Sequence, residues 1–253
     1  MIFVTTSVYA LAKRLGLEAA DREFSRQVQN PTGSSLGCAR VIERLRKLDD
    51  LGLRVDLGVG TAAKMRSRMA DYAWKSGADV WCSIDDDIDA TVETLGNAMD
   101  VVRHTHGVVT VPYLLRRPGG DEVASCDLVE PVLVRVVAGG VHVARSQVGG
   151  MGLVFTHREA LERVRRDGGA PTFVDLDDEG SPSRPALFAE LVGKGGRWYG
   201  EDWSFFLRLA AAGVQIDALL DGVTNHDGRV MPLGALLDLP RPMFDAEPRE
   251  PAP

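Results

Sequence analysis

The sequence lacks cysteine pairs, long apolar runs and the features of a secretion signal. Its three cysteines, Cys38, Cys82 and Cys126, lie far apart and form no CxxC pair, so we expect reduced thiols and no disulfide framework. No segment reaches the roughly 18 consecutive apolar residues that a membrane-spanning helix needs. The first residues carry no basic segment ahead of their apolar part and no small-residue cleavage site. These absences favour a cytoplasmic protein without a membrane span.

Positive charge is also scarce. The formal net charge is −7 and the sequence pI is near 5.3, which argues against a general nucleic-acid binder but leaves room for a local basic patch. With 45% hydrophobic and 26% charged residues, the 253-residue chain suits one globular domain whose core needs no metal or disulfide. We expect a catalytic domain over residues 1–238 and a Pro-rich, acidic tail over residues 239–253.

Strands and helices are predicted to alternate in the first half of the chain. Apolar runs predict strands, apolar residues at helical spacing predict helices, and a polar Gly-containing segment is expected over residues 27–37. The predicted strands cover residues 1–8, 54–60, 78–84 and 105–115, and the predicted helices cover residues 38–52 and 62–73. Such alternation indicates an α/β fold with a mixed, mostly parallel sheet flanked by helices.

The second half is less regular. Residues 133–144 predict a β-hairpin turning at Gly139-Gly140, and residues 149–166 predict a strand that leads into a helix. Residues 167–200 are polar and rich in Gly, Pro and Asp, as expected of a lid, a binding loop or a disordered segment. A helix over residues 201–213 and a strand and loop over residues 214–228 follow.

Four carboxylates follow the apolar strand that ends at Ile84. Asp85, Asp86 and Asp87 are consecutive, and Asp89 comes one residue later. Ligands of open α/β sheets bind beyond the carboxyl ends of the strands, and Mg²⁺ and Mn²⁺ prefer oxygen ligands. The cluster therefore predicts a metal and diphosphate site. A solvated acidic turn, or a cap for a following helix, is the structural alternative.

A different chemistry also fits part of this segment. Asp87, Asp89 and Thr91 match the DxDxT pattern of haloacid-dehalogenase-type phosphatases, in which the first aspartate is the nucleophile. The sequence contains no GDxxxD motif downstream, so this phosphatase is the alternative hypothesis.

A second acidic pair and a histidine occur late in the chain. Glu201 and Asp202 are the first residues of a predicted helix. Carboxylates at this position stabilise a helix through capping and the helix dipole, which is the structural interpretation. The functional interpretation is that Asp202 is a general base. His226 is expected in a loop, between Asn225 and Asp227. It is interpreted either as a surface histidine or as a metal ligand.

The order of these motifs resembles the GT-A fold glycosyltransferases, in particular compact bacterial and phage members. A strand-end DxD precedes a GGMG strand-helix unit, an ED pair opening a helix and a late histidine, and the helix ahead of the DxD carries Arg66-x-Arg68. The likeness covers about residues 54–228. It implies a nucleotide-sugar donor, a Mn²⁺ or Mg²⁺ cofactor and transfer to an acceptor hydroxyl. Inversion is favoured over retention because a base is available.

The resemblance also implies roles for the motif residues. Asp87 is expected to be the main metal ligand, and His226 the late ligand that completes the metal shell. Asp85 is expected to contact the metal or the ribose. Asp86 occupies the variable middle position and is expected to lie against the nucleotide sugar.

Asp202 is expected to deprotonate the acceptor, with Glu201 in support. The residues placed around the nucleotide sugar are Thr5, Thr6, Arg66, Arg68, Gly149, Gly150 and Gly152. The alternative to a binding role is a structural one. The arginines would then lie on a solvated helix face, and the glycines would form a simple turn. Met69 stands where these relatives often carry Asn, which weakens the assignment of the nucleotide base but not that of the metal.

The acceptor is predicted to be a glycan or a hydroxymethylated DNA base. A DNA acceptor would need a basic surface, for which the candidates are Arg40, Arg44, Lys47, Arg116, Arg117, Arg163, Arg165 and Arg166. Trp198, Tyr199 and Trp203 flank the acidic pair and suit either a sugar platform or the core. A non-catalytic nucleotide-binding module remains a third possibility.

Overall fold

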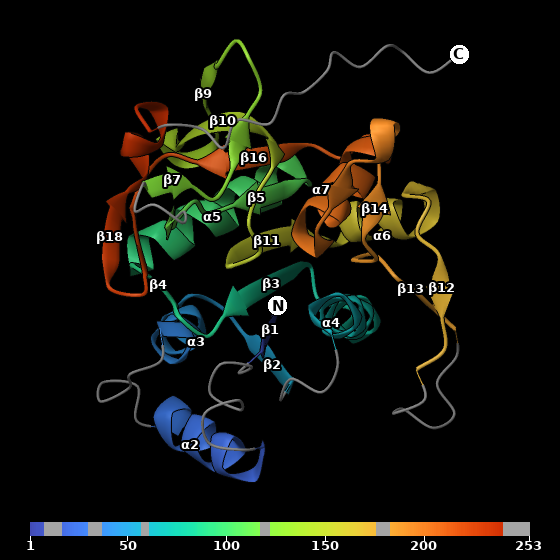
Figure 1. The fold of residues 1–253 in the computed structure, drawn as a ribbon. Helices are drawn as coiled ribbons and strands as arrows, with labels where there is room; N and C mark the ends of the chain where they lie inside the picture. Colours follow the sequence, from blue (N-terminus) through green and yellow to red (C-terminus); the bar gives the residue numbers. More distant parts are fainter. Residues whose placement is uncertain (8–16, 30–36, 57–60, 117–121, 176–182, 240–253) are drawn as a thin grey trace.

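A computed structural model describes residues 1–7, 17–29, 37–56, 61–116, 122–175 and 183–239 (Figure 1). The tail predicted over residues 239–253 lies outside these ranges except for Leu239. Among the described residues, no helix is long and apolar enough to cross a membrane.

A mixed sheet forms the centre of the molecule. Its strands follow the order β2 (Leu51–Asp56), β1 (Ile2–Ser7), β3 (Val80–Asp85), β11 (Leu153–His157), β5 (Val108–Thr110), β16 (Ile216–Leu219), β10 (His142–Val148) and β8 (Asp127–Leu128), and β9 (Val134–Val136) also pairs with β10. The strand pairings make β11 and β10 antiparallel to their neighbours, while the other strands run in one direction. The predicted mixed, mostly parallel α/β sheet is confirmed.

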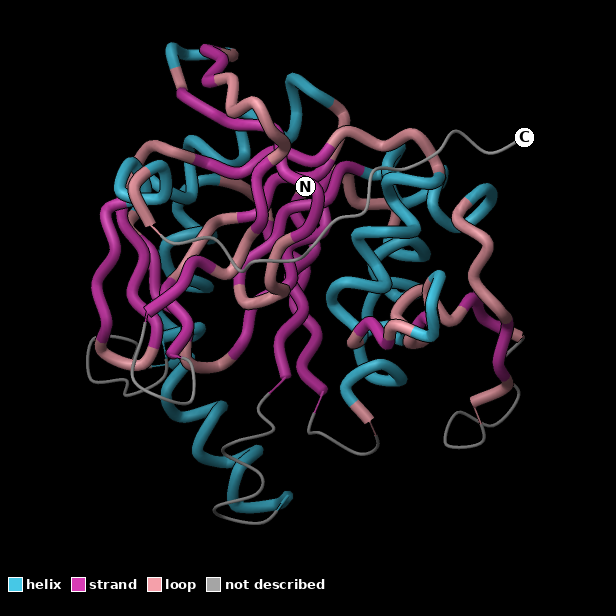
Figure 2. Tube along the Cα trace, turned by 45° about the horizontal axis from the view of Figure 1, so that its top comes forward, coloured by secondary structure: helices cyan, strands magenta, loops and turns pink. Residues whose placement is uncertain are grey.

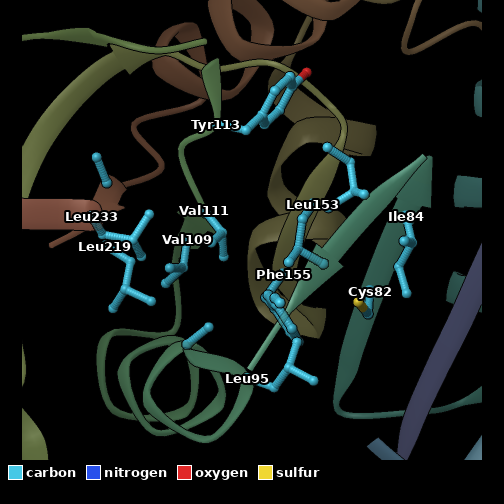
Figure 3. Packing of buried hydrophobic residues seen from close by; sticks show 14 of the residues in the cluster. Cys82, Ile84, Leu95, Val109, Val111, Tyr113, Leu153, Phe155, Leu219 and Leu233 are labelled. Carbon is cyan, nitrogen blue, oxygen red and sulfur yellow. The ribbon is translucent and has the colours of Figure 1, made fainter. Parts of the chain in front are cut away.

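Helices cover both faces of this sheet (Figures 1 and 2). On one face lie α3 (Gly37–Leu48) and α5 (Val92–Thr105), and on the other lie α4 (Ala62–Ser76), α6 (Arg158–Asp167) and α7 (Glu201–Ala211). Successive side chains of a strand point to opposite faces of the sheet, so the side chains of β3 pack alternately against the two helix layers. Cys82 and Ile84 pack toward α3 and α5 (Figure 3), whereas Trp81 packs with Phe188 and Phe205.

Several short ladders are added to the sheet. β4 (Ile88–Ala90), β17 (Val223–His226) and β18 (Arg229–Pro232) form a three-stranded sheet. Two-stranded ladders join β6 (Leu114–Arg116) with β7 (Glu122–Ala124), β12 (Thr172–Phe173) with β13 (Arg184–Pro185), and β14 (Leu191–Val192) with β15 (Trp198–Tyr199). Short 3₁₀ helices occur at η2 (Ala138–Gly140), η3 (Lys194–Gly196) and η4 (Leu233–Leu237).

Some element boundaries differ from those predicted. Helix α2 (Leu17–Gln29) was not predicted, and it contains the start of the segment expected to be polar and irregular over residues 27–37. Strand β2 begins at Leu51 rather than at residue 54, because its first residues already pair with β1. The strand expected over residues 105–115 is two short strands, β5 and β6. The predicted hairpin turning at Gly139-Gly140 is confirmed by the pairing of β9 with β10.

Segment 167–200 is more ordered than the loop that the sequence suggests. The Phe188 N–H donates to Ser67 Oγ of α4 at 3.1 Å, and the Leu191 N–H donates to Ser204 Oγ of α7 at 2.9 Å. The Arg208 guanidinium donates to the Leu187 carbonyl at 3.1 Å. The described part of this segment is thus pinned to two helices, while residues 176–182 lie outside the described ranges.

Gly37 permits the close packing of α3 against the chain that follows the aspartate cluster. A Cβ at this position would lie 2.3 Å from the Ile88 carbonyl oxygen, which belongs to rigid backbone. We expect Gly37→Ala to lower the free energy of unfolding by about 2 kcal/mol, because overpacking must displace α3 or β4.

Gly96 in α5 provides the matched control, since a Cβ added there would have nothing within 4 Å. Gly96→Ala should therefore stabilise the protein by about 0.5–1 kcal/mol. Urea unfolding of both variants checks the pair, and a Gly37→Ala variant as stable as the wild type would contradict the packing.

Candidate active site

The aspartate cluster forms a tight turn between β3 and β4. Asp85 is the last residue of β3, and its N–H donates to the Gly152 carbonyl at 2.9 Å. Asp86 and Asp87 make the turn, and the fully buried Ile88 anchors its far side. Side-chain exposure is 30% for Asp85 and 49% for Asp87. The carboxylates are therefore held by a rigid backbone and remain accessible at the carboxyl end of a central strand.

His226 lies beside this turn because β17 pairs with β4. The register places His226 opposite Ile88, and its Nε2 lies 3.2 Å from a carboxylate oxygen of Asp87. Its Nδ1 lies 2.8 Å from the Leu114 carbonyl oxygen, which can only accept, so Nδ1 carries a proton. Nε2 is consequently aimed at Asp87 and either carries a proton or is available to a cation. Fixing of one ring nitrogen by a backbone carbonyl is typical of metal-binding histidines.

The ionisation of Asp87 and His226 is coupled. The hydrogen bond to Asp87 raises the pKa of His226, against a smaller opposing effect of burial. The same hydrogen bond lowers the pKa of Asp87. Between these two pKa values the pair is a histidinium and a carboxylate.

Arg66 joins the first acidic cluster to the second. Its side chain is 14% exposed, and Nη2 lies 3.1 Å and 3.2 Å from the two oxygens of Asp85. Nη1 lies 3.2 Å from Glu201 and also donates to Asp202. Burial lowers the pKa of Arg66, but the charges of Asp85 and Glu201 together raise it above its ordinary value. One guanidinium thus forms ion pairs with carboxylates from both β3 and α7.

Asp202 has a second, fixed contact. While one carboxylate oxygen accepts from Arg66, the other accepts from the Met151 N–H at 3.2 Å. This N–H belongs to the GGMG turn ahead of β11. The side chain of Asp202 is 25% exposed, which leaves it accessible to a substrate.

Tyr113 is a site residue that the sequence did not single out. It is buried, its ring lies 4.8 Å from the His226 ring, and burial followed by the charge of Asp85 raises its pKa. In Figure 3 its hydroxyl points away from the apolar side chains. In the sequence Tyr113 sits between Pro112 and Leu114 in an apolar run, so no pattern distinguishes it from a core residue.

The glycines of the GGMG turn make room for protein side chains. A Cβ at Gly150 would lie 2.3 Å from the Tyr113 hydroxyl, and one at Gly152 would lie 2.6 Å from its ring. A Cβ at Gly149 would lie 2.5 Å from Thr110 Oγ1. Packing against Tyr113 and Thr110 therefore explains why these positions are glycine, separately from the predicted approach of a sugar.

Other predicted nucleotide contacts lie apart from this cluster. Arg68 pairs with the buried Asp175 at 3.2 Å, because two residues along a helix turn the side chain by about 200° from Arg66. Thr5 accepts from Trp81 Nε1 at 2.8 Å and is fully buried, and Thr6 is also buried. The structure therefore brings Arg66 into the cluster and gives Arg68 and Thr5 partners elsewhere.

The predicted basic surface is largely paired with acids. Arg40 and Arg44 both bind Asp89, with the Arg40 contact at 2.7 Å. Further pairs are Lys47 with Glu43, Arg165 with Asp71, and Arg166 with Asp167. Arg117 lies outside the described residues. These pairings offer little free positive charge for DNA.

The aromatic residues near the acidic pair separate into two environments. Trp203 packs against the core beneath α7, whereas Trp198 on β15 is 64% exposed and Tyr199 is partly buried. Of the two tryptophans, Trp198 is the one placed to meet a partner from solvent.

Comparison with known proteins gives little guidance. No family model and no curated protein matches the chain. Among solved structures, A197 from STIV is similar over 99% of this chain and 98% of its own, with 15% sequence identity and a TM-score of 0.49. This likeness is too distant to support a functional argument, so the function rests on the site.

The pairing of Asp87 with His226 predicts a pH-dependent stability. The raised pKa of His226 stabilises the fold below its ordinary value near 6.5 and stops doing so as the pH rises through the folded value. The lowered pKa of Asp87 stabilises the fold above about 3.8, and this is lost as the pH falls through the folded value. We expect Asp87→Asn to cost at most about 1 kcal/mol near pH 5.5, since Asp87 is half exposed, and nothing at pH 9.

Urea unfolding with a chelator present checks this expectation at both pH values. The exposed Asp167, which pairs with its neighbour Arg166, supplies the control variant Asp167→Asn. An equal loss for Asp87→Asn at pH 5.5 and pH 9 would show that the pair is not ionic.

Proposed function

We propose that the chain is a metal-dependent glycosyltransferase with a GT-A-type catalytic domain over residues 1–238. It would move a sugar from a nucleotide-sugar donor to an acceptor hydroxyl, with inversion. The observation that carries this proposal is the convergence of Asp85, Arg66 and the Glu201-Asp202 pair, with Asp87 and His226 on the same turn. A binding site for a charged donor and a base for an acceptor are thereby adjacent.

The residues of the turn fit a Mn²⁺ or Mg²⁺ ion. Neighbouring ligands of an octahedral ion with bonds near 2.1 Å lie about 3.0 Å apart. The Asp87 oxygen and His226 Nε2 lie 3.2 Å apart, and His226 already has the orientation of a ligand. Asp85 faces Arg66 instead, so Asp87 and His226 would hold the ion. Such ions are commonly held by one or two protein ligands, with waters and substrate phosphates in the remaining positions.

Each functional group of the chain then has a defined task. When bound, the ion would offset the charge that builds on the departing nucleoside diphosphate. Arg66 supplies a further positive charge at the turn and keeps Asp85 and Asp202 together. Asp202 takes the proton from the acceptor hydroxyl, and the Met151 N–H keeps its carboxylate oriented for that transfer.

The phosphatase hypothesis fits the structure less well. In a DxDxT site, the second aspartate and the threonine assist the nucleophile. Here the Asp89 carboxylate binds Arg40 and Arg44, and Thr91 Oγ1 accepts from the Thr94 N–H at 3.1 Å as the cap of α5. Both groups therefore have structural partners away from Asp87.

A glycan is the acceptor that the charges favour. The net charge of the chain is −7, and the candidate arginines of the basic surface are mostly paired with acids. A DNA duplex would be repelled unless it met a compensating patch. A neutral or weakly charged sugar hydroxyl has no such requirement.

A panel of nucleoside diphosphates and nucleotide sugars tests donor binding. With Mn²⁺ present, a donor at about 100 times its dissociation constant should stabilise the wild type by about 2.7 kcal/mol in thermal unfolding. We expect this shift to vanish with a chelator and in Asp87→Asn, and to persist in Asp167→Asn. A metal-independent shift would favour a plain nucleotide-binding module. No shift with any donor, together with phosphate release from a generic phosphate ester, would favour the phosphatase.

Asp202 separates binding from chemistry. We expect Asp202→Asn to keep the donor-induced shift and to lower release of nucleoside diphosphate by about 10²–10⁴-fold with a panel of glycan acceptors, the usual contribution of a general base. The wild type and Asp167→Asn provide the reference rates. Turnover of Asp202→Asn at the wild-type rate would remove Asp202 from the mechanism while leaving the donor site intact.

A further inference from the structure

A second group of metal-ligand side chains lies at the other end of the central sheet. His106 ends helix α5, His157 ends strand β11, and Glu159 lies in the first turn of α6. Their candidate ligand atoms all lie within 4.8 Å of one another. His157 pairs with Val80 at the start of β3, whereas Asp85 closes the far end of that strand. This group is therefore separate from the candidate active site.

The three side chains contact one another directly. His106 Nδ1 lies 3.0 Å from Glu159 Oε1, and the two imidazole rings stack with centroids 4.3 Å apart and planes 10° from parallel. His157 Nδ1 accepts from the Glu159 N–H at 3.2 Å, which caps α6. His106 and Glu159 are each 51% exposed, so an ion can reach them from solvent.

The backbone that carries these side chains is fixed. The His106 N–H donates to the Val102 carbonyl at 3.0 Å, and the His157 N–H donates to the Gly107 carbonyl at 3.0 Å. The Arg158 N–H donates to the Asp79 carbonyl at 2.8 Å. Because the main chain is held, only side-chain rotations are needed to bring the three groups together, which reduces the ordering cost of binding.

The ligand types select the class of ion. Two imidazoles and one carboxylate are typical of Zn²⁺, Co²⁺ and Ni²⁺ sites, whereas Mg²⁺ and Ca²⁺ prefer oxygen ligands. In a tetrahedral site with bonds of about 2.0–2.1 Å, neighbouring ligand atoms lie about 3.3 Å apart. The His106–Glu159 contact is already shorter than this. The stacked rings must tilt so that their lone pairs converge, and the exposed His106 has the freedom to do so.

We propose that His106, His157 and Glu159 form a surface site for a divalent transition-metal ion, with water in the remaining position. His157 would bind through Nδ1, or through Nε2 after its proton moves to Nδ1, and in both cases it gives up the bond that Nδ1 accepts from the Glu159 N–H. Either route makes the site adjustable rather than fully preformed. Binding is expected to be of moderate strength, since two of the three ligands are half exposed.

Co²⁺ is the probe that tests this site, because its visible absorption reports ligand number and geometry. The wild type, titrated with CoCl₂, should develop d–d bands that Zn²⁺ then displaces. His106→Ala removes one ligand. His157→Asn removes another but keeps a side chain that caps helices well, so loss of folding does not confuse the result. Each variant should weaken Co²⁺ binding at least about tenfold.

The other three histidines of the chain provide the controls. His104→Ala and His142→Ala remove exposed imidazoles outside the group, and His226→Ala removes the one in the candidate active site. The bands should persist in all three variants. Absence of bands in the wild type would overturn the proposal. An ion held at Asp87 and His226 would be six-coordinate and absorb only weakly, so the strong bands of four-coordinate Co²⁺ report on the proposed site. Strong bands that survive in both His106→Ala and His157→Asn, or that disappear in His226→Ala, would also overturn the proposal. None of these outcomes depends on glycosyl transfer.

Discussion

The site depends on one buried cation, Arg66. Without it, Asp85, Glu201 and Asp202 would be like charges held close together by the packing of β3 and α7, and their repulsion would act on the fold. Its guanidinium is the group through which α4 is bound to both elements. In this partly buried network, removing Arg66 would leave three carboxylates without compensation, which costs more than the intact network contributes. Arg66 is therefore a structural residue of the candidate site, and the proposed function gives it a second task there.

The position of His226 depends on strand register rather than on its own sequence neighbours. The ladder between β17 and β4 sets His226 opposite Ile88 and so beside Asp87. A slip by one residue would turn every side chain of β17 to the opposite face. The Leu114 carbonyl then fixes the ring orientation. A short three-stranded sheet outside the main sheet thus brings together two groups that are 139 residues apart, at positions 87 and 226.

The sequence predicts local features better than contacts between distant segments. The main sheet strands and α4 follow from apolar periodicity, with Thr61 capping α4 as expected, because these signals are local. The site aspartates, His226 and Arg66 were singled out through their motifs. Tyr113 was missed, since nothing in an apolar run shows that its ring packs beside His226 and lies within the influence of the Asp85 charge. Arg68 was grouped with Arg66 because the resemblance rests on an Arg-x-Arg motif, although residues two apart on a helix point in nearly opposite directions.

The metal sites proposed at the two ends of strand β3 differ in their ligand atoms. Asp85 closes one end, and Val80 at the other end pairs with His157. Five residue steps of about 3.3 Å separate them, or about 16 Å. The turn at Asp87 is rich in carboxylate oxygen, whereas the group around His157 is rich in imidazole nitrogen, so the two ends favour different ions. Because the same rigid strand fixes both positions, each can be altered by substitution without displacing the other.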